Sequence, residues 1–280
     1  MFYLLDHLIQ MKILLNNNDL NEALNKVSNL GFVPTMGGLH KGHISLIRKS
    51  KRKAVKTIVS IFINPTQFNS KKDFNKYPKN HVKDLSILRK LNVNYVYLPK
   101  TNNIYDSKRT KKIQIKKKNK ILCAKYRKGH FEGVLDVMDR LTRKIKPKFI
   151  FMGIKDYQQL HLVKHFVEKK YKCKVIPCKT VRNLNKLALS SRNLLLSKKA
   201  LRQAEKLTQN LIKFKKNLKK VKNIQKAVSA KKNELSKEYN INVEYLELRN
   251  KKDLKKVNYL KYSKLFIAYY LNRVRLIDNF

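Results

Sequence analysis

The sequence predicts an α/β protein, in which a parallel sheet with helices on both faces is followed by a smaller C-terminal α+β domain. Up to about residue 181, short apolar runs of strand length alternate with longer segments of helical spacing. From about residue 182 the pattern changes to two helices followed by two strands. A chain of 280 residues also exceeds the roughly 100–200 residues of most domains. We therefore predict two domains, residues 1–181 and 182–280.

The elements follow from local patterns in chain order. An apolar strand ends near Pro34, and β-branched or aromatic runs predict further strands at 56–63, 93–99, 148–153 and 173–177. Helical spacing predicts helices at 42–53, 81–91, 133–145 and 157–170. In the second domain we predict lysine-rich helices at 198–219 and 222–238, then strands at 242–248 and 264–271. Strands that alternate with helices form parallel sheets, whose ligands bind at the carboxyl ends of the strands.

The composition excludes several classes of protein. A hydrophobic content of 42% is enough for a packed core, so the chain is not disordered as a whole. Three cysteines do not form a disulfide scaffold, and no apolar run is long enough for a membrane-spanning helix. The apolar start, residues 1–15, contains Asp6 and His7 and lacks a basic lead, so we do not predict a signal peptide. We expect a reduced, cytoplasmic protein with no membrane partner.

The net charge of +48, from 66 basic and 18 acidic residues, raises the hypothesis of nucleic-acid binding. The basic residues are spread along the whole chain, however, with runs at 111–120, 213–220 and 251–256. These runs contain almost no aromatic residues on which bases could stack. Lysine and asparagine, which have AT-rich codons, are both abundant. An AT-rich genome could therefore produce the basic charge without any selection for binding. We therefore expect no specific nucleic-acid partner, although the charge would attract phosphate-bearing ligands.

The segment 32–47 carries the most informative motif. An apolar strand leads to two glycines, then to His40 and His43, and then into a helix. Glycines allow the backbone to approach a ligand closely, and a helix N-terminus favours phosphate. Two histidines there can donate hydrogen bonds to phosphate oxygens as charge develops. The alternative is a glycine-rich turn with two surface histidines, which the strand–turn–helix context disfavours.

Three further segments place polar side chains after apolar runs. Residues 60–68 end in a turn with Asn64 and Gln67, whose amides suit hydroxyl and carboxylate groups or simply stabilise the turn. In residues 151–160 a strand ends at Gly153 and is followed by Lys155, Asp156 and Gln159. The lysine can neutralise phosphate, and the aspartate can cap the helix or bind a ribose or a metal. Residues 187–193 contain two serines and Arg192, which can grip phosphate oxygens.

Taken together, these segments resemble the pantothenate synthetase (pantoate–β-alanine ligase) family. The family's stretches PTMG-x-LH-x-GH, SIF-x-NP-x-QF, GHF-x-GV, KDYQQL, TVR, LA-x-SSRN and YLEL are legible at 34–43, 60–68, 129–134, 155–160, 180–182, 187–193 and 245–248. The resemblance covers roughly residues 31–250. It implies a Rossmann-like nucleotidyl-transferase domain with a small C-terminal domain, usually as a homodimer. It also implies a ligase that uses ATP and Mg²⁺ to make pantoyl adenylate and then joins it to β-alanine.

The resemblance also implies roles for individual residues. The catalytic set would be His40, His43, Lys155 and Arg192. ATP would be bound by Met36, His40, His43, Gly153, Lys155, Asp156, Val181, Ser190, Ser191 and Arg192. Pantoate would be held by Gln67, Gln159, Met36, Asn64 and His130, with Arg127 nearby. Asp84 aligns with a position linked to magnesium.

Two positions depart from the family pattern. The family usually has Glu directly before the lysine of KDYQQL, where this chain has Ile154. The family also commonly has Leu-Glu-Gly before the GHF stretch, where this chain has Cys123 in place of Glu. Two carboxylates are therefore missing near the predicted site. The second hypothesis is a related nucleotidyl-transferase that acts on a phosphate ester. Such a substrate would favour Arg or Lys at the positions of Gln67 and Gln159, so the amides favour the ligase.

Overall fold

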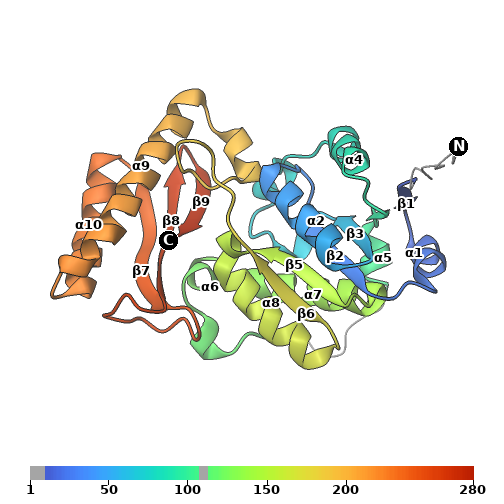
Figure 1. The fold of residues 1–280 in the computed structure, drawn as a ribbon. Helices are drawn as coiled ribbons and strands as arrows, with labels where there is room; N and C mark the ends of the chain where they lie inside the picture. Colours follow the sequence, from blue (N-terminus) through green and yellow to red (C-terminus); the bar gives the residue numbers. More distant parts are fainter. Residues whose placement is uncertain (1–9, 107–112) are drawn as a thin grey trace, which may run out of the picture.

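The computed structural model describes residues 10–106 and 113–280. Two sheets organise these residues, and Figure 1 shows them as a larger and a smaller part of the molecule. The larger sheet is parallel in every pairing and has the order β1-β4-β3-β2-β5-β6. Its strands are β1 (Lys12–Leu14), β2 (Leu30–Thr35), β3 (Lys56–Ile61), β4 (Tyr95–Tyr97), β5 (Phe149–Gly153) and β6 (Lys174–Cys178).

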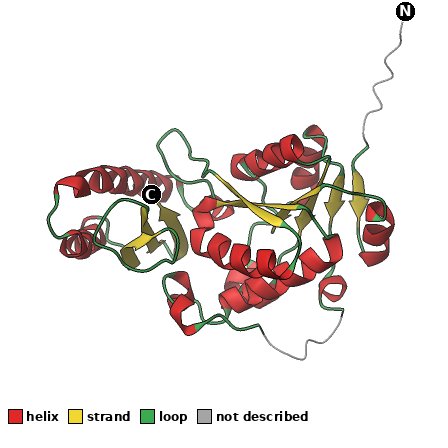
Figure 2. Ribbon diagram, turned by 60° about the horizontal axis from the view of Figure 1, so that its bottom comes forward, coloured by secondary structure: helices red, strands yellow, loops and turns green. Residues whose placement is uncertain are grey.

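Helices cover both faces of this sheet, as Figure 2 shows. The longer ones are α1 (Asn17–Leu24), α2 (Lys41–Lys53), α4 (His81–Lys90), α7 (His130–Ile145) and α8 (Tyr157–Lys170). Shorter ones are α3 (Lys71–Asn75), α5 (Thr101–Ile104) and α6 (Cys123–Tyr126). The predicted α/β class is therefore confirmed, with strand and helix positions close to those expected from the sequence.

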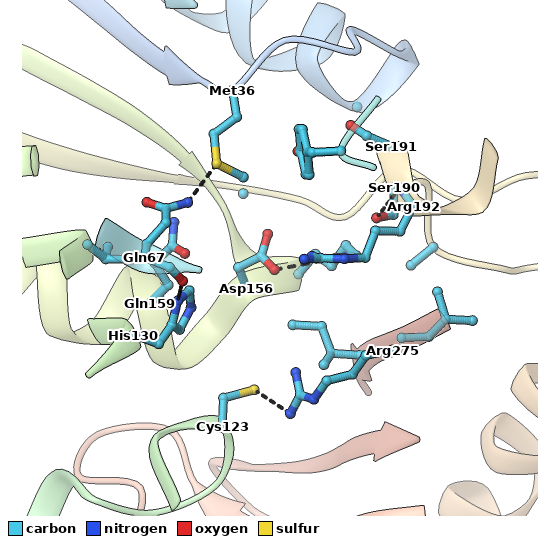
Figure 3. A pocket seen from close by; sticks show the side chains of 18 of the residues that line it. Met36, Gln67, Cys123, His130, Asp156, Gln159, Ser190, Ser191, Arg192 and Arg275 are labelled. Atoms are coloured by element: carbon cyan, nitrogen blue, oxygen red, sulfur yellow. Dashed lines mark hydrogen bonds and ion pairs between the residues drawn. The ribbon is translucent and has the colours of Figure 1, made fainter. Parts of the chain in front are cut away.

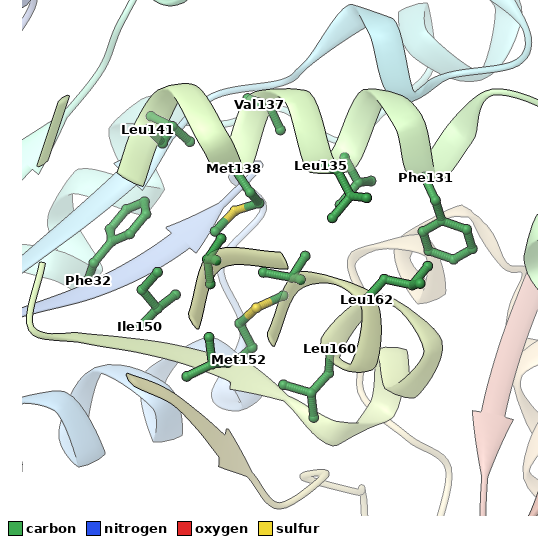
Figure 4. Close-up of a cluster of buried hydrophobic side chains, with 14 of the residues drawn as sticks. Phe32, Phe131, Leu135, Val137, Met138, Leu141, Ile150, Met152, Leu160 and Leu162 are labelled. Atoms are coloured by element: carbon green, nitrogen blue, oxygen red, sulfur yellow. The ribbon is translucent and has the colours of Figure 1, made fainter. Parts of the chain in front are cut away.

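Alternation along the strands explains the two layers. Phe32 and Ile150 belong to the core under α1, α7 and α8, whereas their neighbours Val33 and Phe151 belong to the core under α2 and α4. Successive strand side chains point to opposite faces, so continuous apolar strands bury residues on both sides. Figure 4 shows the first of these cores, where Leu135 and Met138 of α7 meet the sheet.

The strand order creates a crevice at the carboxyl edge of the sheet. From β2 the chain continues outward to β3 and β4, then crosses to the other side of β2 to form β5. Strands β2 and β5 pair only at Gly31–Phe149 and Phe32–Ile150, whereas β2 and β3 pair over the whole length of β2. Beyond Phe32 the two strands are therefore no longer joined. Such a switch point is where open α/β sheets bind ligands.

The smaller part packs two helices on a three-stranded antiparallel sheet. Its elements are α9 (Lys198–Asn217), α10 (Ile224–Glu238), β7 (Asn242–Asn250), β8 (Ser263–Leu271) and β9 (Val274–Asn279). Leu265 and Ile267 of β8 join the core beneath α9 and α10, whereas Phe266 and Ala268 join a core of the larger part. The antiparallel sheet is thus buried on both faces, and one face adjoins the Rossmann-like part.

Some expectations lie beyond these observations. The boundary at residues 181 and 182 stays a prediction. The apolar N-terminal segment falls largely in residues 1–9, outside the described residues, as does the start of the basic run 111–120. Strands β1 and β9 were not expected from the sequence. Within residues 10–106 and 113–280, every helix is too short or too polar to cross a membrane.

Candidate active site

A cavity of about 830 Å³ lies between the carboxyl edge of the parallel sheet and the antiparallel sheet. Of the residues predicted for the site, Asp84 alone does not line it. Figure 3 shows Gln67, Gln159 and His130 on one side of this pocket, with Ser190, Ser191 and Arg192 across from them. The structure therefore brings the separate sequence motifs together in one place.

His40 and His43 form the cap at the start of α2. The Nδ1 atom of His40 accepts a hydrogen bond from the Gly42 amide at 3.0 Å, and Nδ1 of His43 accepts one from the His40 amide at 3.3 Å. An imidazole nitrogen that accepts a backbone N–H carries no proton, so the neutral ring carries its proton on Nε2. The cap thus fixes the tautomer of both rings and leaves an Nε2–H donor on each.

Both histidines are neutral at pH 7. Burial and the nearby Lys155 ammonium lower the pKa of His40 to about 4. Burial, His40 and Lys155 lower the pKa of His43 to about 3. The two rings, whose centroids lie 4.1 Å apart, can therefore donate hydrogen bonds without adding charge to the pocket.

Asp84 of α4 supports the loop that leads into this cap. Its carboxylate oxygens accept hydrogen bonds from the backbone amides of Gly38 and Leu39, at 2.9 and 2.8 Å. Gly37 and Gly38 have φ angles of +79° and +62°, which glycine adopts without strain. In this structure Asp84 holds the glycine turn, and its predicted link to magnesium stays a prediction.

The amide side of the pocket is built on the turn after β3. The Gln67 amide nitrogen lies 2.6 Å from the sulfur of Met36. Asn64 donates to the Gly133 carbonyl at 3.1 Å and accepts from the Tyr105 hydroxyl at 2.7 Å, so its side chain is occupied in holding the turn. The structure gives the Gln159 amide no hydrogen bond to the described residues, which leaves this amide available to a ligand.

His130 and Arg127 lie behind Gln67. Nδ1 of His130 lies 2.7 Å from the Gln67 carbonyl oxygen, to which it donates, so its Nε2 accepts from Nη1 of Arg127 at 2.8 Å. Burial and the Arg127 guanidinium lower the pKa of His130 to about 3. A neutral histidine thus connects Arg127 to the backbone of Gln67.

Lys155 and Asp156 lie in a short 3-10 turn, Ile154–Asp156, between β5 and α8. The Lys155 ammonium lies 3.3 Å from the Asp156 carboxylate. The side-chain amide of Asn279, on β9, donates to the backbone carbonyls of Ile154 and Lys155, both at 2.8 Å. A strand of the C-terminal sheet therefore holds the lysine turn in place.

The serine–arginine segment closes the opposite wall. The Ser191 hydroxyl donates to the Gly38 carbonyl at 3.1 Å, and the Ser190 hydroxyl caps the 3-10 turn Ser191–Leu195. Arg192 pairs with the Asp73 carboxylate at 2.9 Å, so a phosphate would have to compete with Asp73 for this guanidinium. Gly153 and Val181 also line the pocket, as predicted.

Sequence reasoning missed the contribution of β9 to this pocket. Arg275 pairs with the Glu244 carboxylate at 2.6 Å and approaches the Cys123 sulfur at 3.3 Å, as Figure 3 shows for Arg275 and Cys123. The Cys123 thiol also contacts the Tyr245 hydroxyl at 3.1 Å. No motif pointed to Arg275. Ile154 packs beside the main core, so the turn before Lys155 is anchored by apolar contact.

The parallel sheet has an open switch point, and its carboxyl edge has a histidine-capped helix and cationic side chains. This combination defines a nucleotide-using enzyme of the Rossmann-like α/β class. The particular family follows from comparison with known proteins. The family model "Pantoate-beta-alanine ligase" matches residues 11–280, and the chain belongs to this family.

Individual relatives agree with this membership. The pantothenate synthetase of Campylobacter hominis is 39% identical over 271 residues, which cover 96% of this chain and 99% of the relative. The crystal structure of pantothenate synthetase from Thermus thermophilus matches with a TM-score of 0.90 at 29% identity, covering 96% of this chain and 99% of the other. The ligase from Francisella tularensis, complexed with beta-gamma ATP and beta-alanine, matches with a TM-score of 0.82 at 35% identity, covering 97% of each chain.

Proposed function

We propose that the chain condenses pantoate with β-alanine to form pantothenate, through a pantoyl-adenylate intermediate made from ATP. Membership of the pantoate-beta-alanine ligase family supports the overall reaction. The observation that carries the site assignment is the convergence of two Nε2–H donors, Lys155 and the amide Gln159 on one cavity.

In the first step a carboxylate oxygen of pantoate attacks the α-phosphorus of ATP, and the bond to the departing pyrophosphate breaks. In the second step the amine of β-alanine attacks the acyl carbon and AMP leaves with the electron pair of the broken C–O bond. The first step needs positioning and stabilisation of charge on phosphate oxygens. We assign this stabilisation to Nε2–H of His40 and His43 and to Lys155, with Arg192 and the serines on the remaining phosphate oxygens.

We assign pantoate to the amide side of the pocket. Gln67 and Gln159 can hydrogen-bond hydroxyl and carboxylate groups without adding charge, and Met36 packs beside Gln67. Asn64 and His130 act by holding Gln67 in place, since their polar atoms are engaged with the turn and its backbone. Neutral amides are poorly suited to a phosphate ester, which argues against the alternative nucleotidyl-transferase.

Mg²⁺ fits this site as an ion that accompanies ATP. The described residues contain no cluster of three His, Cys, Asp or Glu side chains that could form a ready metal site. Mg²⁺ usually binds through one or two carboxylates together with substrate phosphates. Asp156, whose side chain is 45% exposed, would hold it, and the ion would neutralise phosphate charge. We also propose that the protein is a cytoplasmic homodimer. Sedimentation analysis would test the dimer, and fractionation of cells would test the compartment.

The first test is pantoate-dependent exchange of labelled pyrophosphate into ATP, with Mg²⁺ present and β-alanine absent. Exchange would support adenylation of a carboxylate, and later addition of β-alanine should yield pantothenate and AMP in equal amounts. The matched control omits pantoate and should show no exchange. Absence of exchange with folded protein would contradict the proposal.

A further inference from the structure

Three of the guanidinium groups that line the pocket come from different parts of the chain: Arg127, Arg192 and Arg275. Arg192 and Arg275 are both close enough to Arg127 to lower its pKa. Two of them have carboxylate partners, since Arg192 pairs with Asp73 at 2.9 Å and Arg275 pairs with Glu244 at 2.6 Å. No carboxylate among the described residues lies within ion-pair distance of Arg127. Among the described residues, Arg127 is therefore a cation in the pocket wall without a directly paired carboxylate.

The contacts of Arg127 are all with neutral groups. Its Nη1 donates to Nε2 of His130 at 2.8 Å, and its Nη2 donates to the Gln67 carbonyl at 3.3 Å. A guanidinium has five N–H donors, so these two bonds leave donors free for a ligand. Burial, with Arg192 and Arg275 nearby, lowers the pKa of Arg127 to about 10. A partly buried cation beside two others is unfavourable until an anion binds, because buried charges require partners.

The reaction brings three kinds of anion to this pocket. The phosphates of ATP have donors of their own in the histidine cap and Lys155. The carboxylate of pantoate loses its negative charge when it becomes an acyl adenylate. It could therefore pair with Arg127 only before the first step. The carboxylate of β-alanine stays ionised from binding to product. Only two methylene groups separate it from the amine that must reach the pantoate acyl carbon, and Arg127 hydrogen-bonds the backbone of Gln67 in the pantoate subsite.

We propose that Arg127 binds the spectator carboxylate of β-alanine, and so selects this amine and aims it at the acyl adenylate. This inference rests on the proposed function. In the step concerned, the amine nitrogen forms a bond to the acyl carbon, the C–O bond to AMP breaks, and the nitrogen loses a proton to solvent. Arg127 keeps its charge throughout and acts only by binding.

The test compares β-alanine with propylamine, a primary amine that lacks the carboxylate. In Arg127→Met, kcat/KM for β-alanine should fall roughly 30-fold or more, as for loss of one partner of a charged, hydrogen-bonded pair. The reaction with propylamine should be unchanged, so the preference for β-alanine collapses. Pantoate-dependent pyrophosphate exchange should be retained. Arg127→Lys, which keeps a charge without the fork, should recover part of the preference.

Lys128→Met removes the same charge from an exposed neighbour and is the matched control, with an unchanged preference expected. Loss of pyrophosphate exchange in both Arg127→Met and Arg127→Lys would show that Arg127 serves pantoate, and would overturn the inference. An unchanged preference in Arg127→Met would overturn it as well. Failure of the proposed function is distinct, because the wild-type chain would then show no exchange at all.

Discussion

Each of the two histidines that begin α2 uses its two nitrogen atoms for different purposes. One nitrogen accepts a backbone amide and completes the helix cap, and the other presents a proton to the pocket. The same side chain thus caps the helix and has the donor that our proposal uses in chemistry, and a well-chosen substitution can separate the two.

His43→Asn should separate them, because the Asn carbonyl can accept the His40 amide but offers no group in place of Nε2–H. We expect pyrophosphate exchange to fall about 100-fold, as for the loss of one oriented donor. The free energy of unfolding should change little. His43→Ala, which loses both functions, should show the same loss of exchange and about 1 kcal/mol less stability. Near-normal exchange in His43→Asn would contradict this assignment.

The neutral histidines also give the protein a predictable response to acid. Their pKa values of about 4 for His40, and about 3 for His43 and His130, lie below the ordinary 6.5. Between about pH 4 and 6.5 the unfolded chain therefore binds protons that the folded chain does not. Stability should be retained above pH 6.5 and fall below it, by about 2 kcal/mol per such histidine at pH 5.

Urea unfolding of the wild type at pH 7.5 and pH 5 would measure this loss. His43→Asn should lose less stability than the wild type over the same interval, because one of the depressed groups is absent. Equal stability of the wild type at both pH values would show that these rings are not held neutral.

Single residues differ in how far the sequence can predict them. His40, Gln67 and Lys155 stand in motifs after strands, and the carboxyl edge of a parallel sheet brings such segments together. The lack of a paired carboxylate at Arg127 among the described residues could not be predicted in this way. It depends on which carboxylates reach which arginines in space, and Asp73 and Glu244 come from distant parts of the chain.

At the scale of elements, the approach of α7 to the turn after β3 shapes the side of the pocket that we assign to pantoate. A Cβ atom at Gly133 would lie 2.4 Å from the carbonyl oxygen of Thr66, which is backbone and cannot move aside alone. The absence of a side chain at Gly133 therefore lets the helix and the Asn64–Gln67 turn pack closely.

Gly133→Ala should push this turn away from the helix. We expect a loss of about 1–3 kcal/mol in the free energy of unfolding, as for overpacking. The KM for pantoate should rise more than the KM for ATP, because Gln67 moves while the histidine cap does not. Glu132→Ala, the preceding residue on α7, is the control. Equal changes in both KM values would contradict the assignment of Gln67 to pantoate.

The elements that the sequence failed to predict have physical reasons for this failure. Strand β1 has only three residues, too few to show a period. Strand β9 ends in Asp278 and Asn279, which are buried although they are polar. Asp278 pairs with Arg182, and Asn279 holds the turn that carries Lys155. These polar residues interrupt the alternation of apolar residues by which a strand is recognised in a sequence.

At the scale of the molecule, the antiparallel sheet contributes to the wall of the candidate site as well as to its own core. Asn279 supplies the side-chain hydrogen bonds to the Ile154–Asp156 turn, across the interface between the two sheets. Both parts of the chain therefore contribute to the candidate site. Lys155 belongs to the larger part, and Asn279 of the smaller part holds its turn in place.

Asn279→Asp should disturb this link, because a carboxylate oxygen would replace the amide donor opposite two carbonyl oxygens. We expect the KM for ATP to rise by about tenfold or more, with a smaller effect on pantoate, since a single buried charged hydrogen-bond mismatch costs over 1 kcal/mol. Asn217→Asp, an exposed asparagine at the end of α9, makes the same charge change as a control. An unaltered KM for ATP in Asn279→Asp would rule out this coupling.

The Asn279 bond spans a long stretch of chain, since it joins residues 124 positions apart. During synthesis the N-terminal part emerges from the ribosome first and can fold while the C-terminal strands are still being made. Until Asn279 emerges, the turn that carries Lys155 lacks its brace. We therefore expect a nascent chain to form its parallel sheet before Lys155 reaches its final position, and to gain the proposed adenylation activity only after the antiparallel sheet has docked.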